Sequence, residues 1–425
     1  MLTKLRLKRF KNFEDTELHL GNFTLLVGEN ASGKSNLRDA FRFIHGISRG
    51  YNLAEIMGEK YAEGGVLQWR GIRGGTREIT FQNSPTFELE VSFSINYEDC
   101  VRQVTYQIEV DTETLDSVPR AYAESLLIEG CEDAIFKSKH FHITSDISSE
   151  LGARAYGEQS FSMTSLPSYR PVLSQIVSNK FPNIFPKDKF LVIREIAQKS
   201  LDALSDMRFL DFNPEAMRLP SFPGQTVLGD RGENLSSVLQ NICADSQRKQ
   251  ALIQWVQELT PMDAADFEFS ADFTGRILLT LIEAHGQKTS AISASDGTLR
   301  FLAMIAALLE PEPAQFYFFE ELDNGIHPTR LNLLLQLIDR QVEQNKIQIV
   351  ATTHSPQLLR ILSPKALDFA SLTYRLPDRA DAKIKRIVDI PDAKRLIQEQ
   401  DLARLHESGW LEDSVYFLED GKTVA

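Results

Sequence analysis

The hydrophobic pattern of the chain opens with two alternating runs, at residues 3–8 and 16–20, followed by a continuous apolar run at Phe23–Val27. Alternation is typical of strands with one buried face, and a short continuous run suits a strand that is buried on both faces. A glycine-rich stretch comes next, and then SNLRDAFRFIHGI, which has the spacing of a helix. We therefore expect a strand–loop–helix unit to open the first lobe of the protein.

The middle of the chain has a weaker pattern. Phe87–Val110 alternates and predicts a meander of two or three antiparallel strands, whereas serines accumulate and the pattern fades between about 124 and 180. Four further features are expected downstream: a helix over Asp188–Ser205, a proline-containing linker over Asn213–Gly224, two helices within Asn234–Leu259 and a hairpin over Phe267–Glu283.

The last third of the chain alternates helices and buried strands. We expect helices over Thr298–Glu310 and Thr329–Gln344, and strands over Phe316–Phe319 and Ile347–Ala351. The pattern indicates four ranges: an N-terminal lobe with the β meander at 1–125, a helical and irregular insertion at 126–285, a C-terminal lobe at 286–375, and a tail region at 376–425.

Composition places the chain among globular proteins. It has 425 residues, of which 42% are hydrophobic and 25% charged. No apolar run reaches the length of a membrane span, and no apolar stretch follows the basic N-terminus, so we expect a cytoplasmic protein with no membrane partner. The three cysteines lie far apart, without metal-ligand spacing. The net charge of −13 argues against a surface coated in positive charge for nucleic acid, although a local basic patch stays compatible with it.

The first chemical motif is the segment GENASGKS, which fills every position of the phosphate-binding pattern G-x-x-x-x-G-K-[ST] and lies between the expected strand and helix. Gly28 and Gly33 allow backbone N–H groups to close around phosphate oxygens, and the helix adds the positive end of its dipole. In this pattern Lys34 reaches the β- and γ-phosphates, and the Ser35 hydroxyl binds Mg²⁺.

The second motif is FYFFEE, a buried strand that ends in two carboxylates. Open α/β sheets bind ligands at the carboxyl ends of their strands, so Glu320 is the candidate metal ligand and Glu321 the candidate that activates the attacking water. Taken alone, the pair would also suit an acidic turn in solvent.

Two further motifs lie on either side of this strand. His354 follows the next apolar strand, in ATTHSP, where it could donate to a γ-phosphate or to the attacking water. The segment SASDGTLR precedes an apolar helix, where Ser295 and Gly297 would form a second anion site. Ser295 or Asp296 would equally serve as the N-cap of that helix, and both roles can hold together.

These four blocks, in this order, resemble the ABC-type ATPases of the RecF, SMC and OLD families. SDGTLRFL stands where their signature stands, FFEELDNGIHP where their Walker B segment and D-loop stand, and the start LRLKRFKNFED and GKSN are similar to RecF-like proteins. GDRGENLSSVL resembles a block of stand-alone bacterial members. The resemblance implies an α/β fold: an ABC-type P-loop NTPase head with a two-lobed mixed sheet, an antiparallel β subdomain and a mostly helical insertion.

The resemblance also implies ATP and Mg²⁺ as cofactors, held between the heads of a homodimer or higher homo-oligomer. Nucleotide contacts carry over to Gly28, Asn30, Gly33, Lys34, Ser35 and Asn36 of one copy, and to Ser295 and Gly297 of the other. Lys34, Glu321 and His354 are the expected catalytic residues, and Ser35 and Glu320 the metal ligands. The chain departs from the family where Glu320 replaces an aspartate and Asp296 replaces the first signature glycine. Gln68 and Gln82 both remain candidates for the Q-loop glutamine.

Three functions compete. The first is an ATPase whose head dimerisation controls a separate effector, a nuclease or toxin, in anti-phage defence, as in heads that resemble those of the PARIS or Septu systems. The tail Tyr416–Thr423 is faintly similar to the start of a TOPRIM domain, but no later D-x-D pair follows it. The second is RecF-like DNA repair, with basic candidates in two clusters and Trp69 available to stack: Lys8, Arg9 and Lys11, then Arg70, Arg73 and Arg77. The third, a transporter subunit, fits the RecF-like start poorly.

Overall fold

A computed structural model describes residues 1–63, 65, 67–113, 118–141, 150–164, 166–178, 185–259, 263–327, 330–354, 356–359, 361–376, 379–391, 393 and 414. The chain forms two compact units. Unit 1 comprises Met1–Gly21, Gly28–Met207 and Ser371–Arg386, and unit 2 comprises Asn22–Val27, Arg208–Ala370 and Ile387–Ala425. Each unit therefore draws on distant parts of the sequence, and the four predicted ranges stay a prediction.

Unit 1 is built on an eight-stranded antiparallel sheet in the order β11-β10-β9-β8-β7-β6-β1-β2. The strands are β1 (Leu2–Phe10), β2 (Phe13–His19), β6 (Thr86–Tyr97), β7 (Cys100–Asp111), β8 (Arg120–Ile128), β9 (Phe136–Phe141), β10 (Glu150–Ala155) and β11 (Ser162–Thr164). Buried and less buried positions alternate along β6 and β7, as expected for strands with one face on a core.

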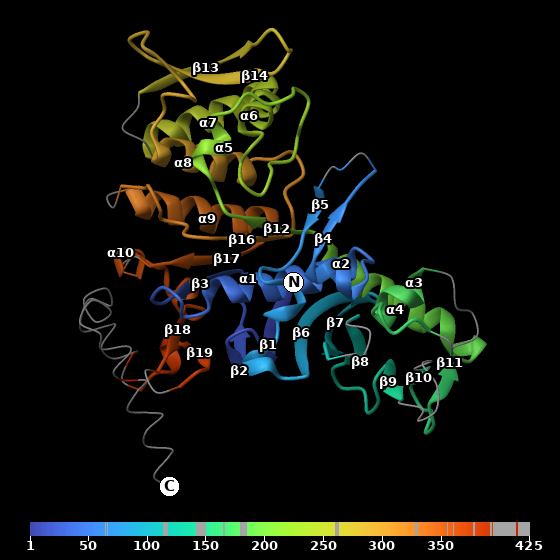
Figure 1. Cartoon of the computed structure of the whole chain (residues 1–425). Helices are drawn as coiled ribbons and strands as arrows, with labels where there is room; N and C mark the ends of the chain where they lie inside the picture. Colours follow the sequence, from blue (N-terminus) through green and yellow to red (C-terminus); the bar gives the residue numbers. More distant parts are fainter. Residues whose placement is uncertain are drawn as a thin grey trace. The chain divides into compact units, whose positions relative to one another are not determined.

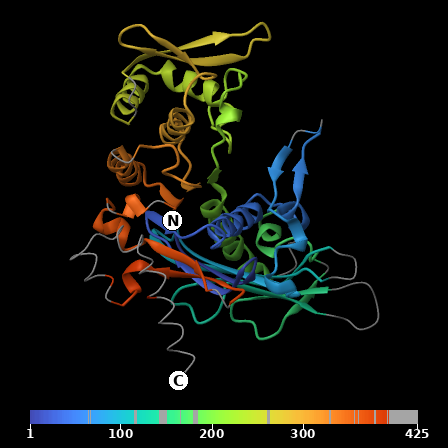
Figure 2. The same ribbon diagram turned by 60° about the vertical axis from the view of Figure 1, so that its left-hand side comes forward.

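Helices of unit 1 cover one face of this sheet, which Figure 2 shows nearly from its edge. The helices are α1 (Lys34–Ser48), α2 (Leu53–Met57), α3 (Val172–Val177) and α4 (Lys187–Ser205), and α4 contacts both α1 and β6. The unit also contains the small hairpin of β4 (Glu59–Tyr61) and β5 (Leu67–Arg70), and the hairpin of β18 (Ser371–Arg375) and β19 (Ala382–Arg386), which contacts β2. The helix α1 is thus fixed on a broad sheet.

Unit 2 contains buried strands in the order β12-β16-β17-β3 (Figure 1), of which β16, β17 and β3 run parallel. These are β3 (Phe23–Val27), β12 (Met207–Leu210), β16 (Phe316–Phe319) and β17 (Gln348–Thr353). Every position of β3, β16 and β17 is buried, as expected for parallel strands covered on both faces. The helices α9 (Leu331–Asn345) and α11 (Pro364–Leu367) contact β3.

The rest of unit 2 is a helical layer under a three-stranded sheet. Its helices are α5 (Pro214–Met217), α6 (Leu235–Ala244), α7 (Ser246–Leu259) and α8 (Asp296–Leu308), and its strands are β13 (Ala264–Ala271), β14 (Ile277–Glu283) and β15 (Lys288–Ser290). The short helix α10 (Pro356–Leu359) lies outside this layer and follows β17 in the chain. The helices α6 and α7 lie against β13 and β14, and α6 and α7 also contact α8 (Figure 1). In this way α8 is held by α6 and α7.

Most expected elements are confirmed. The buried strands at Phe23–Val27 and Phe316–Phe319 have the predicted bounds, and α4, α6, α7, α8 and α9 fall within two residues of the helices expected there. The hairpin expected at Phe267–Glu283 is β13 and β14. The linker expected at Asn213–Gly224 contains the short helix α5, which Asn213 caps through a hydrogen bond from the Ala216 amide.

The strands β9, β10 and β11 were not expected, and they add sheet to the range 126–285, which was expected to be helical and irregular. The sequence of β9, FKSKHF, explains the difference. Ser138 and His140 occupy buried positions on it, at 3% and 5% exposure, while lysines alternate with them. Because both faces carry polar residues, the strand shows no apolar–polar alternation.

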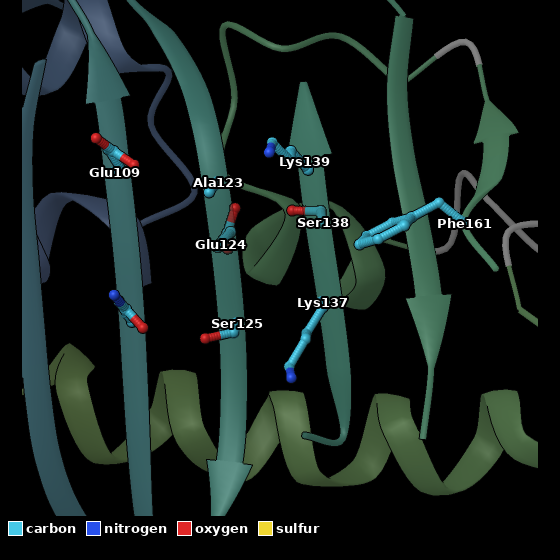
Figure 3. Close-up of a pocket in the computed structure, with 9 residues that line it drawn as sticks. Glu109, Ala123, Glu124, Ser125, Lys137, Ser138, Lys139 and Phe161 are labelled. Carbon is cyan, nitrogen blue, oxygen red and sulfur yellow. The ribbon is translucent and has the colours of Figure 1, made fainter. Parts of the chain in front are cut away.

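Glu124 of β8 is a carboxylic acid inside unit 1, with only 2% exposure. Its oxygens accept hydrogen bonds from the amides of Val172 (2.6 Å) and Leu173 (2.7 Å), at the start of α3, and from the Tyr106 hydroxyl (2.8 Å). Burial raises the pKa of Glu124 to about 7, outweighing the lowering by these three donors. Glu124 pairs in register with Ser138, beside a depression with a cavity volume of about 270 Å³ (Figure 3).

We predict that Glu124 makes folding less stable as pH rises from 4.5 towards about 7. Between these two pKa values the folded protein keeps a proton on Glu124 that the unfolded chain has lost. The stability contributed by this group is therefore fully present below pH 4.5 and is lost as the pH rises through the folded-state pKa of about 7. The full difference corresponds to on the order of 3 kcal/mol. Urea unfolding between about pH 5 and about pH 8 should show a smaller fall in stability for Glu124→Gln than for the wild type. Glu129→Gln, at an exposed position, is the control, and an unchanged pH slope in Glu124→Gln would contradict the prediction.

Candidate functional site

The glycine-rich loop that leads into α1 wraps around the ammonium group of Lys34. This side chain is only 6% exposed, and its Nζ donates to the carbonyl oxygens of Gly28 (2.6 Å) and Glu29 (2.7 Å). The helix α1 begins at Lys34, and the first amides of a helix have no carbonyl partner within it. A cation and a helix N-terminus in one loop form a site suited to phosphate.

Two glycines of this loop are required by close contacts inside unit 1. A Cβ on Gly28 would lie 2.1 Å from the carbonyl oxygen of Thr373 in β18. Gly33, the N-cap of α1, has φ 108°, and a Cβ there would lie 2.7 Å from the Phe13 ring. The buried Ser32 hydroxyl lies 2.8 Å from that of Thr373. The loop is therefore held by β18 and by the turn between β1 and β2.

The remaining predicted residues of the loop differ in their surroundings. Ser35 is half-buried in the first turn of α1, and Asn30 is exposed. The side-chain amide of Asn36 donates through its nitrogen to Asn12 Oδ1 (2.7 Å), and its oxygen accepts from Arg73 Nη2 (3.3 Å). These two bonds connect α1 to neighbouring segments of unit 1. Nucleotide contacts of Asn30 and Asn36 stay predictions.

The parallel strands of unit 2 bring the other motifs to one edge. Ala351 of β17 pairs in register with Phe319 of β16 on one side and with Leu25 of β3 on the other. The carboxyl ends of parallel strands lie at the same edge of a sheet, and Glu320 and His354 directly follow β16 and β17 there. At this edge β3 continues along the chain into the glycine-rich loop.

Glu321 is held in an unusual backbone conformation. Its φ of 49° lies in the left-handed region, which costs about 1–2 kcal/mol for a residue with a Cβ. The Glu321 amide donates to Thr352 Oγ1 (2.9 Å), and its carboxylate accepts from the Asn324 side chain (2.8 Å). Strain that the surroundings maintain in this way is typical of functional sites.

A second threonine of β17 supports the same turn. The Thr353 hydroxyl donates to Asp323 Oδ1 (2.7 Å), and the Leu322 amide donates to the carbonyl oxygen of Thr352 (3.0 Å). His354 comes next and is exposed. The end of β17 thus fixes the acidic turn and presents the histidine beside it.

The start of α8 confirms that Ser295 is a helix N-cap. Its hydroxyl accepts from the Thr298 amide (3.1 Å) and lies 2.8 Å from the Thr298 hydroxyl. Gly297 contacts the backbone of Gly325 so closely that a Cβ would lie 2.1 Å from the Gly325 carbonyl oxygen. The signature turn therefore rests directly on the segment that follows the paired glutamates.

The carboxylate of Asp296, which replaces a glycine of the family pattern, is paired with Arg218. Arg218 Nη2 lies 2.5 Å from Asp296 Oδ1 and donates to the carbonyl oxygen of Ala294 (3.1 Å). This hydrogen bond raises the pKa of Arg218. The negative charge at the start of α8 is thus matched by a positive one.

A protein-family model described as "AAA domain, putative AbiEii toxin, Type IV TA system" matches residues 23–98 and 169–360, together more than half of the chain. The chain belongs to this family of AAA domains. The matched ranges contain the glycine-rich loop, the signature turn, the paired glutamates and His354. Family membership and an intact phosphate loop make the chain a P-loop ATPase of the AAA type, as expected from the phosphate-binding motif.

Individual relatives are more distant. An "ATP/GTP phosphatase" of Helicobacter pylori (strain ATCC 700392 / 26695) is 22% identical over 392 residues, which cover 88% of this chain and 91% of the relative. An SMC head domain from Thermotoga maritima is 13% identical, with a TM-score of 0.41 over 91% of this chain and 98% of that one. An SMC head bound to the C-winged helix domain of ScpA is 14% identical, with a TM-score of 0.47 over 90% and 96%.

The basic residues considered for DNA are largely engaged within unit 1 of this AAA-family protein. Lys8 Nζ lies 2.7 Å from Glu88, Arg9 Nη2 lies 2.9 Å from Glu109, and Lys11 and Arg73 both contact Asp39, as the ion pairs show. The idea that Trp69 could stack on a base is wrong. Its ring is 9% exposed, and its Nε1 donates to the Ile56 carbonyl oxygen (3.0 Å).

Several supporting residues of the site were missed from sequence. Thr352, Asn324 and Arg218 support the predicted residues, and Arg300 of α8 lines, with Glu320 and Glu321, a cavity of about 10 Å³, the order of one water molecule. Thr352 and Asn324 lie inside the motifs that contain His354 and the paired glutamates, so their place next to the predicted residues could have identified them. Arg218 lies far from α8 in sequence and carried no signal.

Two expectations about particular segments stay undecided. Gln68 in β5 and Gln82 are both exposed, and the choice of Q-loop glutamine between them remains open. The TOPRIM-like segment Tyr416–Thr423 lies outside the described residues. Within the described part of the chain, no helix has the length and apolar character needed to cross a membrane.

We predict that Thr352→Val lowers ATP turnover about fivefold to a hundredfold, because it leaves the Glu321 amide without its acceptor, a loss that typically costs about 1–3 kcal/mol. Thr352→Ser keeps the hydroxyl and should stay within about threefold of the wild type. Steady-state ATP hydrolysis measures both. Equal turnover in the valine and serine variants would show that the hydrogen bond does not hold Glu321 for reaction.

Proposed function

We propose that MgATP joins two copies of this ATPase, and that this pairing controls a separate effector protein, a nuclease or toxin, in anti-phage defence. The ATP bound by the loop of one copy meets the signature turn at Ser295–Gly297 of the other. A chain with one loop and one signature turn completes two sites when two copies pair by a two-fold axis.

The observation that carries the proposal is the exposed and rigid start of α8. Ser295 and Asp296 are exposed, although the rest of α8 is almost wholly buried. The turn is fixed by the Ser295 cap, by Arg218 and by the backbone of Gly325. A helix N-terminus that is built and presented outwards supports a phosphate brought by a second molecule.

In this proposal, residues of the loop bind the phosphates, and residues of the loop and of the acidic turn bind Mg²⁺. Lys34 and the amides around Gly28 and Gly33 would bind the β- and γ-phosphates. Mg²⁺ prefers oxygen ligands and keeps several waters and phosphates in its shell, so the Ser35 hydroxyl and the Glu320 carboxylate suit it. Bound Mg²⁺ would neutralise charge on the phosphates. Glu320, longer than the usual aspartate by one methylene, would reach further from the strand end.

Hydrolysis in this proposal depends on the acidic turn of unit 2. Glu321 accepts a proton from the attacking water, and Thr352 and Asn324 fix its position. His354 donates to the γ-phosphate as negative charge moves during the reaction. Loss of the γ-phosphate removes the link between the two copies, and they separate.

Control of an effector is supported by the family description, which names a toxin–antitoxin system. It is also supported by the likeness to stand-alone heads of defence systems. Direct DNA repair has less support, because four of the six basic candidates already contact acidic side chains. We therefore assign the chain an ATP-dependent switching role.

We predict that Glu321→Gln binds ATP and accumulates as a dimer, because the γ-phosphate persists between the two copies. Mass measurement in solution, with and without MgATP, should show one chain becoming two. Lys34→Ala/Glu321→Gln should stay a monomer, and Ser295→Arg/Glu321→Gln should bind ATP without pairing. If Ser295→Arg/Glu321→Gln still formed a dimer with ATP, the signature turn would not be the contact between the two copies.

The effector is tested by co-expression with the products of neighbouring genes, including any that encodes a TOPRIM-like or HNH nuclease. We predict a complex whose stability differs between the wild type with ATP and the Lys34→Ala variant. A protein that pairs with ATP but retains none of these products would limit the proposal to the ATPase step.

A further inference from the structure

Arg218, just after α5, bonds to two groups at the start of α8 and to Glu215 of α5. Nη2 bonds to Asp296 Oδ1 (2.5 Å) and to the Ala294 carbonyl oxygen (3.1 Å), while Nη1 bonds to Glu215 (2.7 Å). The Arg218 side chain is 19% exposed, whereas those of Asp296 and Glu215 are 67% and 85% exposed. The Arg218 side chain is thus largely covered, whereas both of its carboxylate partners are exposed.

The charge of Asp296 has opposite effects on the helix and on an incoming phosphate. A carboxylate in the first turn stabilises a helix through its dipole. The same carboxylate repels an anion that approaches the helix N-terminus. A bonded cation removes the repulsion and leaves the cap intact, which explains why an aspartate can stand where the family has a glycine.

We propose that Arg218 is a positioning residue for the ATP reaction: it neutralises Asp296 and fixes residues 294–296 so that this turn can accept the γ-phosphate of ATP held by the partner copy. This inference rests on the proposed function. Arg218 acts through the turn and is not itself assigned a contact with ATP.

An arginine suits this task better than a lysine. Its planar group donates in two directions at fixed geometry, here to a carboxylate and to a backbone carbonyl of the same turn. Lysine would keep the charge but would hold the turn at a single point. The two contributions, charge and geometry, can therefore be separated by substitution.

The test compares Arg218→Gln with the double variant Arg218→Gln/Asp296→Asn, using the KM for ATP, turnover and thermal unfolding. One uncompensated charge several ångströms from a phosphate predicts a rise of about tenfold in KM for Arg218→Gln. The rise should shrink as salt is added, since salt screens exposed charges. The double variant should return to within about threefold of Asp296→Asn alone.

Two matched variants isolate the cause. Glu215→Gln removes the other carboxylate on Arg218 without touching the α8 turn, and its KM should match the wild type. Arg218→Lys keeps the positive charge and should recover most of the loss. A double variant as impaired as Arg218→Gln, with no salt dependence, would overturn charge compensation and leave only a packing role.

Failure of this inference can be told apart from failure of the proposed function. If Glu321→Gln pairs with ATP and Arg218→Gln keeps the wild-type KM at low salt, the role of Arg218 is wrong and the pairing stands. If Glu321→Gln binds ATP without pairing, the proposed function and the inference fall together. If Arg218→Gln does not fold, the double variant Arg218→Gln/Asp296→Asn still tests the proposal: its KM should lie within about threefold of Asp296→Asn alone, and a KM about tenfold above that of Asp296→Asn would overturn charge compensation.

Discussion

The position of β17 between β16 and β3 is the constraint on which the catalytic end of unit 2 depends. Parallel register fixes the carboxyl ends of the three strands at one edge, so the paired glutamates and His354 emerge together. The last two residues of β17 then act as acceptor and donor for the acidic turn, through Thr352 to the Glu321 amide and through Thr353 to Asp323. A strained Glu321 persists because the strand end holds it.

In this acidic protein, the charged side chains described above have their partners close to them in space. Glu124 is buried against the start of α3 and titrates near neutrality because burial outweighs its three donors. Asp296 is exposed at the start of α8 and is paired with Arg218. The basic residues near β1 are paired with acids of the same sheet, which lowers the positive field available to nucleic acid. The net charge alone also argued against nucleic-acid binding, but it could not show which lysines form ion pairs.

The predicted site residues occupy the kinds of position that the motifs imply: a phosphate loop before a helix, acids after a buried strand, and a capping serine before another helix. Their roles in catalysis stay predictions, while the ATPase family is established by the match across the chain. The strand β9 escaped prediction because the polar residues Ser138 and His140 occupy its buried positions, and alternation of apolar residues is the signal on which strand prediction depends.

The sequence by itself determined the local units of this protein: the buried strands, the helices and the motifs between them, because periodicity, glycine spacing and capping act over a few residues. Tertiary structure alone decided which distant groups meet. Thr373 lies against Gly28, the amides of Val172 and Leu173 bond to Glu124, and Arg218 neutralises Asp296. Such contacts depend on how strands and helices are registered across long stretches of chain, and no local pattern of residue types encodes that register.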